Sequence, residues 1–250
     1  MAIASIDLKW YGSAVMPDND TTTSIGGAIN LLIKIEFTDI TPTGAVEMLS
    51  NGADTTQTVT ITGRNAAGEV ISETKTLNAG TPVDFTSLWE RILKVVMSTT
   101  AVGTVTIRKD GAGGDLVTLE PGLTQVRRLF YSPLSEEVGG ATRTYYEKIF
   151  VKNTHGTLSL TNSVVSEFAD PLTFCNFALE ASLNGTDTNG AGNRQTHTGG
   201  YTFNSTAKNV VNGQNLTAAS AQGVWMSLTL TAGLAPAKSS VTMRITGDTI

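Results

Sequence analysis

The sequence predicts an all-β protein with two antiparallel β-sandwich modules, Ig-like or jelly-roll-like, an extended N-terminal arm and long loops. Apolar residues alternate with polar ones at a period of two through most of the 250-residue chain. Threonine fills many of the polar positions, and a stiff β-branched residue suits a wet sheet face. Turns rich in Gly and Asn separate the short runs, and the length is sufficient for two domains of ordinary size.

The first module is predicted over residues 25–131, and its clearest pattern is the stretch TVTITGRNAAGEVISETKTL at 58–77. Val59 and Ile61 alternate with threonines, which predicts a half-buried strand. The residues from Gly63 to Gly68 are expected to form the turn of a hairpin. The inward face of the return strand stays ambiguous, because Val70 lies on the opposite face to Ile71 and Leu77.

Further strands are predicted on both sides of this hairpin. INLLIKIEFTDI at 29–40 follows a glycine pair, and the strand at 103–108 is expected to return through the turn at 109–115. RILKVVMS at 91–98 alternates as a strand. The preceding TSLWE is expected to form one short helical turn capped by Thr86 or Ser87.

A linker is predicted at 132–144, because SPLSEEVGGATRT has Pro, a Gly pair and charge without an apolar period. The second sandwich is predicted over 145–250, with five strands: YYEKIFVKN, TLSLTNSVVSEF, LTFCNFALEASL, GVWMSLTL and SVTMRITG. One face of the third is expected to hold Cys175, Phe177, Leu179, Ala181 and Leu183. In the fifth, Val241, Met243 and Ile245 are predicted to face inward, and Thr242, Arg244 and Thr246 outward.

Two long segments lack a strand pattern and are predicted to be exposed: the arm at 1–24 and the loop at 184–215. Trp10 and Tyr11 are expected to anchor the arm on a neighbouring subunit, because aromatic residues dominate the energetics of interfaces. Tyr201 and Phe203, the aromatic pair of the loop, are the other candidate assembly contacts. Trp89 and Trp225 lie within strands or at their ends, which favours a place in the core.

No arrangement of residues predicts catalysis, a cofactor or a metal site. His155 and His197 are expected in solvated turns, and no nucleophile or zinc motif accompanies them. Acidic clusters at 18–20, 110–115 and 187–190 fit the turn preferences of Asp and Asn better than a calcium loop. The glycines at 111–114 precede a strand, so no helix N-terminus is expected to meet a phosphate. Glu136 and Glu137 fit a solvated acidic pair in the linker better than a glycosidase pair.

Charge and hydropathy exclude several classes of partner. The net charge is -5 and no basic run is present, which disfavours nucleic acid. No segment has the apolar length of a membrane helix, and the N-terminus does not resemble a signal peptide. The single Cys175 is expected to be buried, as in a protein made in a reducing cytosol. Charged residues make up 16% of the chain, against about 25% in average domains, which suits a protein in contact with other chains.

Several segments resemble virion structural proteins of tailed bacteriophages: 26–29, 54–78, 89–98, 143–153 and 223–240. The resemblance implies a non-enzymatic structural protein, made in the bacterial cytoplasm and built into the virion. It implies as partners further copies of the chain and other virion proteins, the major capsid protein first. The role expected first is a capsid decoration or cement protein that bridges capsid subunits. The alternatives are a tube, collar or fibre-attachment component of the neck or tail, and a carbohydrate-binding β-sandwich that touches the host surface.

Overall fold

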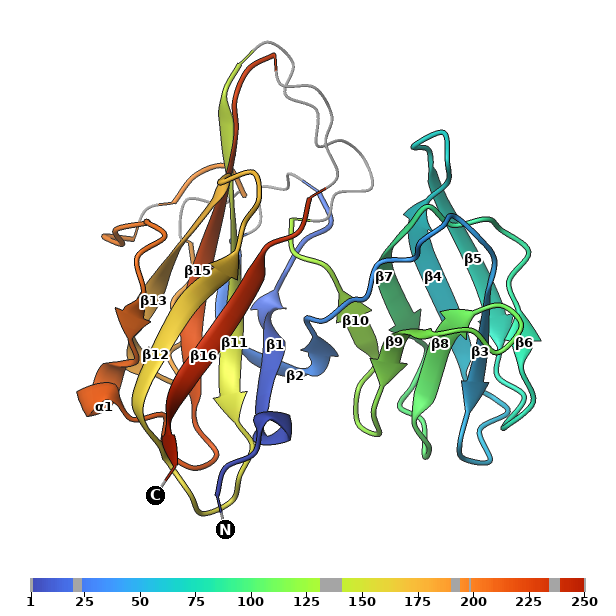
Figure 1. Cartoon of the computed structure of the whole chain (residues 1–250), viewed down its shortest axis with the longest axis horizontal. Coiled ribbons are helices and arrows are strands. Elements are labelled where there is room, and N and C mark those ends of the chain that lie inside the picture. The colour runs from blue at the N-terminus through green and yellow to red at the C-terminus, as the bar shows by residue number, and fades with distance from the viewer. Residues whose placement is uncertain are drawn as a thin grey trace. The chain divides into compact units, whose positions relative to one another are not determined.

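The computed structural model describes residues 2–19, 24–130, 141–189, 194–197, 199–233 and 239–249. The fold is all-β with antiparallel sheets, as the sequence predicts. The chain divides into two compact units: unit 1 comprises residues 1–30 and 135–250, and unit 2 comprises residues 31–134. The colour in Figure 1 follows residue number, so the strands of unit 2 run from blue to green and the later strands of unit 1 from yellow to red. The assignment of each unit as an Ig-like or jelly-roll-like sandwich stays a prediction.

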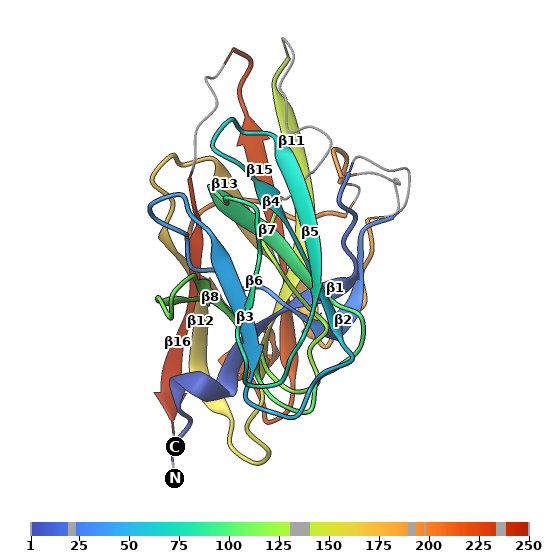
Figure 2. The same ribbon diagram turned by 90° about the vertical axis from the view of Figure 1, so that its right-hand side faces the viewer.

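Unit 2 is built from two sheets. One has the strand order β10-β7-β4-β5, and the other has the order β6-β3-β8-β9 (Figure 1). Figure 2 shows β4, β5 and β7 of the first and β3, β6 and β8 of the second from another side. The strands are β3 (Val46–Ser50), β4 (Thr58–Arg64), β5 (Val70–Thr76), β6 (Val83–Asp84), β7 (Arg91–Met97), β8 (Val105–Lys109), β9 (Asp115–Leu119) and β10 (Gln125–Arg127). Strand β2 (Gly26–Lys34) crosses the division between the units, and its last residues pair in parallel with β10.

The predicted hairpin of unit 2 is confirmed. Strands β4 and β5 pair in antiparallel register from Thr58 opposite Thr76 to Arg64 opposite Val70. Val59 and Ile61 are fully buried, and exposed residues alternate with half-buried ones along β5, with Ile71 on the half-buried side. The ambiguous register of the return strand is thereby resolved, because β5 ends its sheet and buries neither face completely.

One local prediction is wrong, and another is confirmed only in part. TSLWE forms no helical turn, because the side chain of Glu73 accepts hydrogen bonds from the backbone N–H groups of Thr86 and Ser87, each at 2.9 Å. A carboxylate on the neighbouring strand thus satisfies the donors that a helix cap would have to satisfy. The strand predicted over 29–40 is present, but it begins at Gly26 and ends at Lys34.

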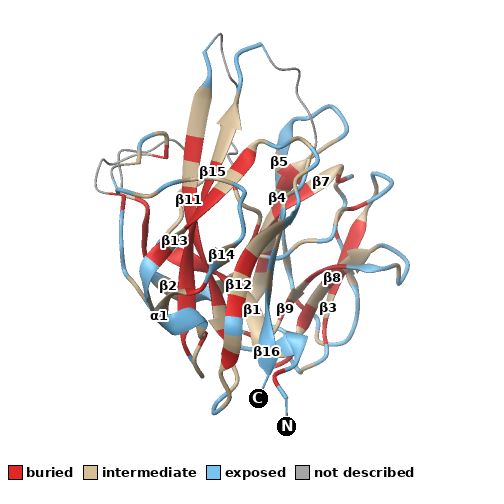
Figure 3. Ribbon diagram, turned by 60° about the vertical axis from the view of Figure 1, so that its left-hand side comes forward, coloured by how far each residue is buried: buried red, intermediate tan, exposed pale blue. Residues whose placement is uncertain are grey.

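Unit 1 also contains two sheets, with the strand orders β13-β15-β11-β1 and β14-β12-β16 (Figure 3). The strands are β1 (Leu8–Val15), β11 (Arg143–Asn153), β12 (Leu160–Ala169), β13 (Cys175–Leu183), β14 (Lys208–Asn209), β15 (Ala221–Leu230) and β16 (Thr242–Thr249). Two short helical turns accompany them, the 3-10 turn η1 (Ser5–Asp7) and α1 (Val211–Gln214). Red bands in Figure 3 mark the buried residues, which are dense in β11, β13 and β15.

The N-terminal segment is part of unit 1 and not a free arm. Leu8–Val15 forms β1, which pairs antiparallel with β11 from Leu8 opposite Asn153 to Gly12 opposite Ile149. An uncovered edge of β11 would expose a row of unpaired backbone groups, and β1 satisfies them. Both ends of the chain therefore build one unit. The predicted linker at 132–144 lies mostly outside the described residues, and its last residues, Arg143 and Thr144, open β11.

The predicted inward faces are confirmed in part. From Val241 to Thr246, exposed positions alternate with half-buried ones as predicted, and the last three residues of β16 are all exposed. In β13, Cys175 and Phe177 are buried, but Glu180 is buried as well, and Ala181 is exposed. A register shift between Leu179 and Leu183 in the pairing with β15 breaks the alternation there. Trp89 and Trp225 are both 0% exposed, which confirms their predicted place in the core.

Candidate functional site

The most unusual feature of unit 1 is a pair of adjacent, oppositely charged residues inside its main sheet. Glu147 and Lys148 follow one another in β11, and both are buried. Adjacent residues of a strand point to opposite faces, so each charge needs its own partner. Lys148 pairs with Glu180 at 2.8 Å, and Glu147 pairs with Arg194 at 2.7 Å. All four side chains are at most 1% exposed.

The sheet register explains why Lys148 meets Glu180. Trp225 of β15 lies opposite Lys148 on one side and opposite Ala178 of β13 on the other. Glu180 follows Ala178 by two residues, which returns it to the face of Lys148. Gly223 supplies the space, because a Cβ there would lie 2.0 Å from Oε2 of Glu180. The register and this glycine together create a site for one buried carboxylate.

Lys148 also holds two neighbouring loops through their backbones. Its Nζ donates hydrogen bonds to the carbonyl oxygens of Gly27 at 2.9 Å and Asp187 at 3.0 Å. The Glu180 carboxylate accepts the N–H of Asp187 at 2.7 Å. Burial lowers the pKa of Lys148, and the hydrogen bond and charge of Glu180 oppose that effect. Through its bonds to one carboxylate and two backbone carbonyls, the Lys148 side chain ties these loops to the sheet.

The segment predicted as an exposed loop at 184–215 has mostly exposed or half-buried residues in its described part, but it is also attached to the rest of unit 1. Asn189 donates its backbone N–H to the carbonyl of Ile25 at 2.9 Å, and the carbonyl of Arg194 accepts the N–H of Tyr146 at 2.7 Å. The pairing of β1 with β11 ends at Ile149, so the backbone of Tyr146 is open to this segment. Residues 190–193 and 198 lie outside the described residues.

An aromatic cluster covers the same face of the sheet, and His197 is at its centre. We define the aromatic cluster as Tyr146, His197, Tyr201, Phe203 and Trp225. The His197 ring lies 4.8 Å from Trp225 at an interplanar angle of 83°, and 5.2 Å from both Tyr146 and Phe203. Edge-to-face contacts of this kind stabilise packed aromatic groups. The prediction of a solvated His197 is therefore wrong, and burial lowers the pKa of its imidazole.

Tyr201 connects the aromatic cluster to the buried charges. Its hydroxyl donates a hydrogen bond to the Asp187 carboxylate, and its ring lies 5.4 Å from His197. Burial raises the pKa of Tyr201, and the bond to Asp187 raises it further, so the phenol stays neutral and keeps its donor. The ring is held by its neighbours, a geometry that favours anchoring of the segment.

The other two predicted contact residues lie in β1. Trp10 is opposite Val151 and half-buried, while Tyr11 is opposite Phe150 and 9% exposed. The structure therefore brings Tyr201 and Phe203 together, and the described ring contacts of that cluster do not include Trp10 or Tyr11. A role of these residues in assembly stays a prediction.

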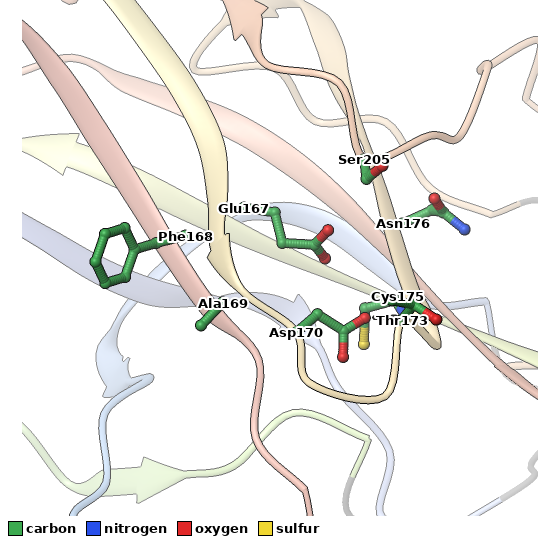
Figure 4. Close-up of a pocket in the computed structure, with 8 residues that line it drawn as sticks. All are labelled: Glu167, Phe168, Ala169, Asp170, Thr173, Cys175, Asn176 and Ser205. Carbon is green, nitrogen blue, oxygen red and sulfur yellow. Dashed lines mark hydrogen bonds between the residues drawn. The ribbon is translucent and has the colours of Figure 1, made fainter.

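A small pocket lies where β12 ends and β13 begins (Figure 4). Its volume is about 170 Å³, below the ~300 Å³ at which typical ligand sites begin. Glu167, Asp170 and Cys175 line it; burial raises the pKa of Cys175 to about 12, and the charges of Asp170 and Glu167 add to the shift. A thiol with so high a pKa is a poor nucleophile at neutral pH. The burial predicted for Cys175 is confirmed.

Three carboxyl groups of unit 2 converge within 4.8 Å of one another, those of Glu47, Asp84 and Asp110. Glu47 already accepts hydrogen bonds from the Arg108 side chain at 2.5 Å and from the N–H of Ala112 at 3.0 Å. Asp110 accepts the N–H of Gly111 at 2.8 Å, which is ordinary turn chemistry. These bonds give Glu47 and Asp110 partners within the protein.

The sequence reasoning missed the buried ion pairs. The available signal was the dipeptide Glu147-Lys148 inside YYEKIFVKN, because charges in the middle of an otherwise apolar strand must be paired when the strand is buried. The partners, Glu180 and Arg194, have no local signal, since their roles depend on strand register and on the path of a distant loop.

No protein-family model, curated protein or solved structure matches the chain. In the part of the chain that the structure describes, no helix has the length and apolar character to cross a membrane.

Proposed function

We propose that the chain is a non-enzymatic structural protein of a tailed-bacteriophage virion, namely a capsid decoration or cement protein that binds and bridges capsid subunits. The observation that carries this proposal is the use made of the buried charges in unit 1. Lys148, Glu180, Glu147 and Arg194 are paired within the protein and hold loops to a sheet. Charges arranged in this way stabilise the folded structure, and a stable surface for neighbouring subunits is what an assembly protein would require.

Composition and resemblance support the same role. A charged fraction of 16% leaves a surface with little repulsion between copies, and two compact β units offer several faces for neighbours. The segments that resemble phage virion proteins include β4 with β5, β11 and β15, the strands that build both units. Within this proposal each unit is a β-sandwich.

The partners proposed are further copies of this chain and other virion proteins, with the major capsid protein as the main one. The protein would be made in the cytoplasm of the bacterial host and would act in the virion. Many weak contacts repeated over a symmetric shell would supply the affinity, so single substitutions on the sheet surfaces should have mild effects.

Quantitative mass spectrometry of purified particles tests the proposal. The amount of this chain is measured relative to the major capsid protein, with isotope-labelled peptides from both proteins. A ratio near one is expected for decoration of the whole shell. A few copies per particle, a small multiple of three or six, would instead favour a ring of the neck or tail. Absence of the chain from particles would overturn the virion role.

A further inference from the structure

Strand β5 has a free outer edge. It pairs with β4, and the backbone bonds at its two ends show how it is oriented. Leu77 donates its N–H to the carbonyl of Gln57 at 2.9 Å, and the carbonyl of Glu69 accepts the N–H of Asn65 at 3.1 Å. Successive residues of a strand direct their backbone groups to opposite edges. Odd-numbered residues of β5 therefore bond to β4, and even-numbered residues point away from it.

The outward groups belong to Val70, Ser72, Thr74 and Thr76. All four residues are exposed, and their backbone groups have no hydrogen bond on the outer side within the described part of the chain. An exposed edge of this length is a template for pairing with another strand. A suitable partner must match its hydrogen-bonding pattern and its charges.

We propose that this edge pairs with β5 of a second copy of the chain, antiparallel and about a two-fold axis at Thr74. The sequence of β5 is self-complementary in that register. Thr74 lies opposite itself, Ser72 lies opposite Thr76 of the second copy, and the outward N–H and C=O groups of these residues face one another. Glu73 then lies opposite Lys75 of the second copy, and the symmetry repeats this pair.

The two charge pairs fall at the positions where side chains approach most closely. In an antiparallel ladder the residues between hydrogen-bonded pairs have Cα atoms about 4.5 Å apart. Opposite charges directly across a ladder stabilise it, and like charges destabilise it. Glu73 already accepts the N–H groups of Thr86 and Ser87 and pairs with Lys75 of its own chain at 3.2 Å. The second copy therefore meets an ordered carboxylate, and its Lys75 adds a second cation to that pair.

Neighbouring registers are less complementary. An axis at Thr76 places Lys75 opposite Leu77 and leaves Glu73 beyond the end of the partner strand. An axis at Ser72 places Glu73 opposite Ile71 and Lys75 opposite Glu69. Glu69 lies outside β5, and its side chain already accepts a hydrogen bond from Asn65 at 2.9 Å. The axis at Thr74 is the register in which both charged residues of β5 are paired within the strand. This self-association goes beyond the proposed virion role and does not depend on it.

The first experiment is sedimentation equilibrium of the purified full-length chain over a wide range of concentration. The unmodified chain is expected to show a monomer–dimer equilibrium. Thr74→Pro removes an outward N–H at the axis and should raise the dimer dissociation constant by about tenfold or more. Thr74→Val is the matched control, because both variants lose the hydroxyl that lies 2.8 Å from Thr60 Oγ1, but valine keeps the N–H.

A chain that stays monomeric at every concentration would overturn the proposal. So would a Thr74→Pro variant that dimerises as tightly as the unmodified chain, because the dimer would then use another surface. The mass ratio measured in virions has no bearing on either result, so the two proposals can fail separately.

A cysteine experiment tests the register and remains decisive if Thr74→Pro does not fold. At the axis the two Cα atoms would lie about 5.5 Å apart, within the reach of a disulfide. Thr74→Cys should therefore form a covalent dimer under mild oxidation in dilute solution, and Ser72→Cys should not. The unmodified chain serves as the blank, because Cys175 is 7% exposed. Crosslinking through Ser72→Cys alone, or through neither variant, would contradict the register.

Discussion

Removal of Lys148 tests the anchoring role of the buried charges. In Lys148→Met the Glu180 carboxylate, which is 1% exposed, loses its counter-ion, and the carbonyls of Gly27 and Asp187 lose a donor. Removal of one partner of a buried ion pair costs about 3–5 kcal/mol, chiefly because the remaining charge stays buried. We expect the free energy of unfolding of unit 1 to fall by an amount in this range.

The assay is urea denaturation, with separate transitions fitted for the two units. Lys152→Met is the matched control, since Lys152 lies on the same strand and face and donates one bond to the carbonyl of Ala219. That variant should lose only about 1 kcal/mol, the net contribution of an ordinary hydrogen bond. The double variant Lys148→Met/Glu180→Gln should recover part of the loss, because glutamine is neutral and keeps an acceptor for the Asp187 N–H.

Two results would refute this reasoning. A loss in Lys148→Met no larger than that in Lys152→Met would mean that the ion pair does not contribute as a buried pair. A double variant as unstable as the single one would mean that the cost does not come from the isolated carboxylate of Glu180.

Three further predictions concern single side chains. Burial alone would raise the pKa of Glu73, but its hydrogen bonds to backbone N–H groups outweigh burial and lower the pKa from 4.5 to about 2. Glu73 therefore stabilises unit 2 above pH 4.5, and this stabilisation is lost as the pH falls toward 2. Acid titration of unit 2 stability should show a shallower slope in Glu73→Gln, and an unchanged slope would contradict the role of Glu73. Gly26→Ala should destabilise unit 1 by about 2 kcal/mol or more, because the new Cβ would lie 2.7 Å from the Trp225 ring at a φ of +95°. In Gly27→Ala the nearest atom to the new Cβ would lie at 3.5 Å, and this variant should cost about 1 kcal/mol. Equal shifts in urea midpoint for the two glycine variants would exclude the clash. Burial lowers the pKa of His197 below 6.5, so the imidazole binds a proton more readily in the unfolded chain than in the folded one. Unit 1 should therefore lose stability as the pH falls through 6.5, and His197→Phe should remove that dependence. A pH dependence that persists in His197→Phe would mean that another group causes it.

The hairpin of β4 and β5 was predictable because its information is local. Val59 and Ile61 alternate with threonines, and the turn lies between the two strands that it joins. Strand β1 was not predictable in the same way, because Leu8 pairs with Asn153 across most of the chain. A short alternating segment near a terminus carries no sign of its distant partner, so it was interpreted as an arm.

The candidate site could not be predicted from the sequence for a related reason. The polar composition of 184–215 indicated an exposed loop, yet Arg194 and His197 acquire their roles from Glu147 and Trp225, which distant strands contribute. Composition describes the solubility of a segment, whereas its attachment depends on a few specific contacts. The aromatic character of Tyr201 indicated that its ring would make contacts. Nothing in the sequence around Tyr201 indicated the buried charges beside the aromatic cluster.

Hydrogen exchange of the isolated chain tests most directly whether the buried charges of unit 1 hold the segment after β13 in place. The amides of Asp187 and Asn189 donate to Glu180 and to the carbonyl of Ile25, so both should exchange slowly in the unmodified protein. In Lys148→Met these two amides should lose protection while those of β4 in unit 2 keep theirs. Exchange of Asp187 and Asn189 at the rate of an unstructured peptide in the unmodified chain, with β11 and β15 still protected, would contradict the anchoring role.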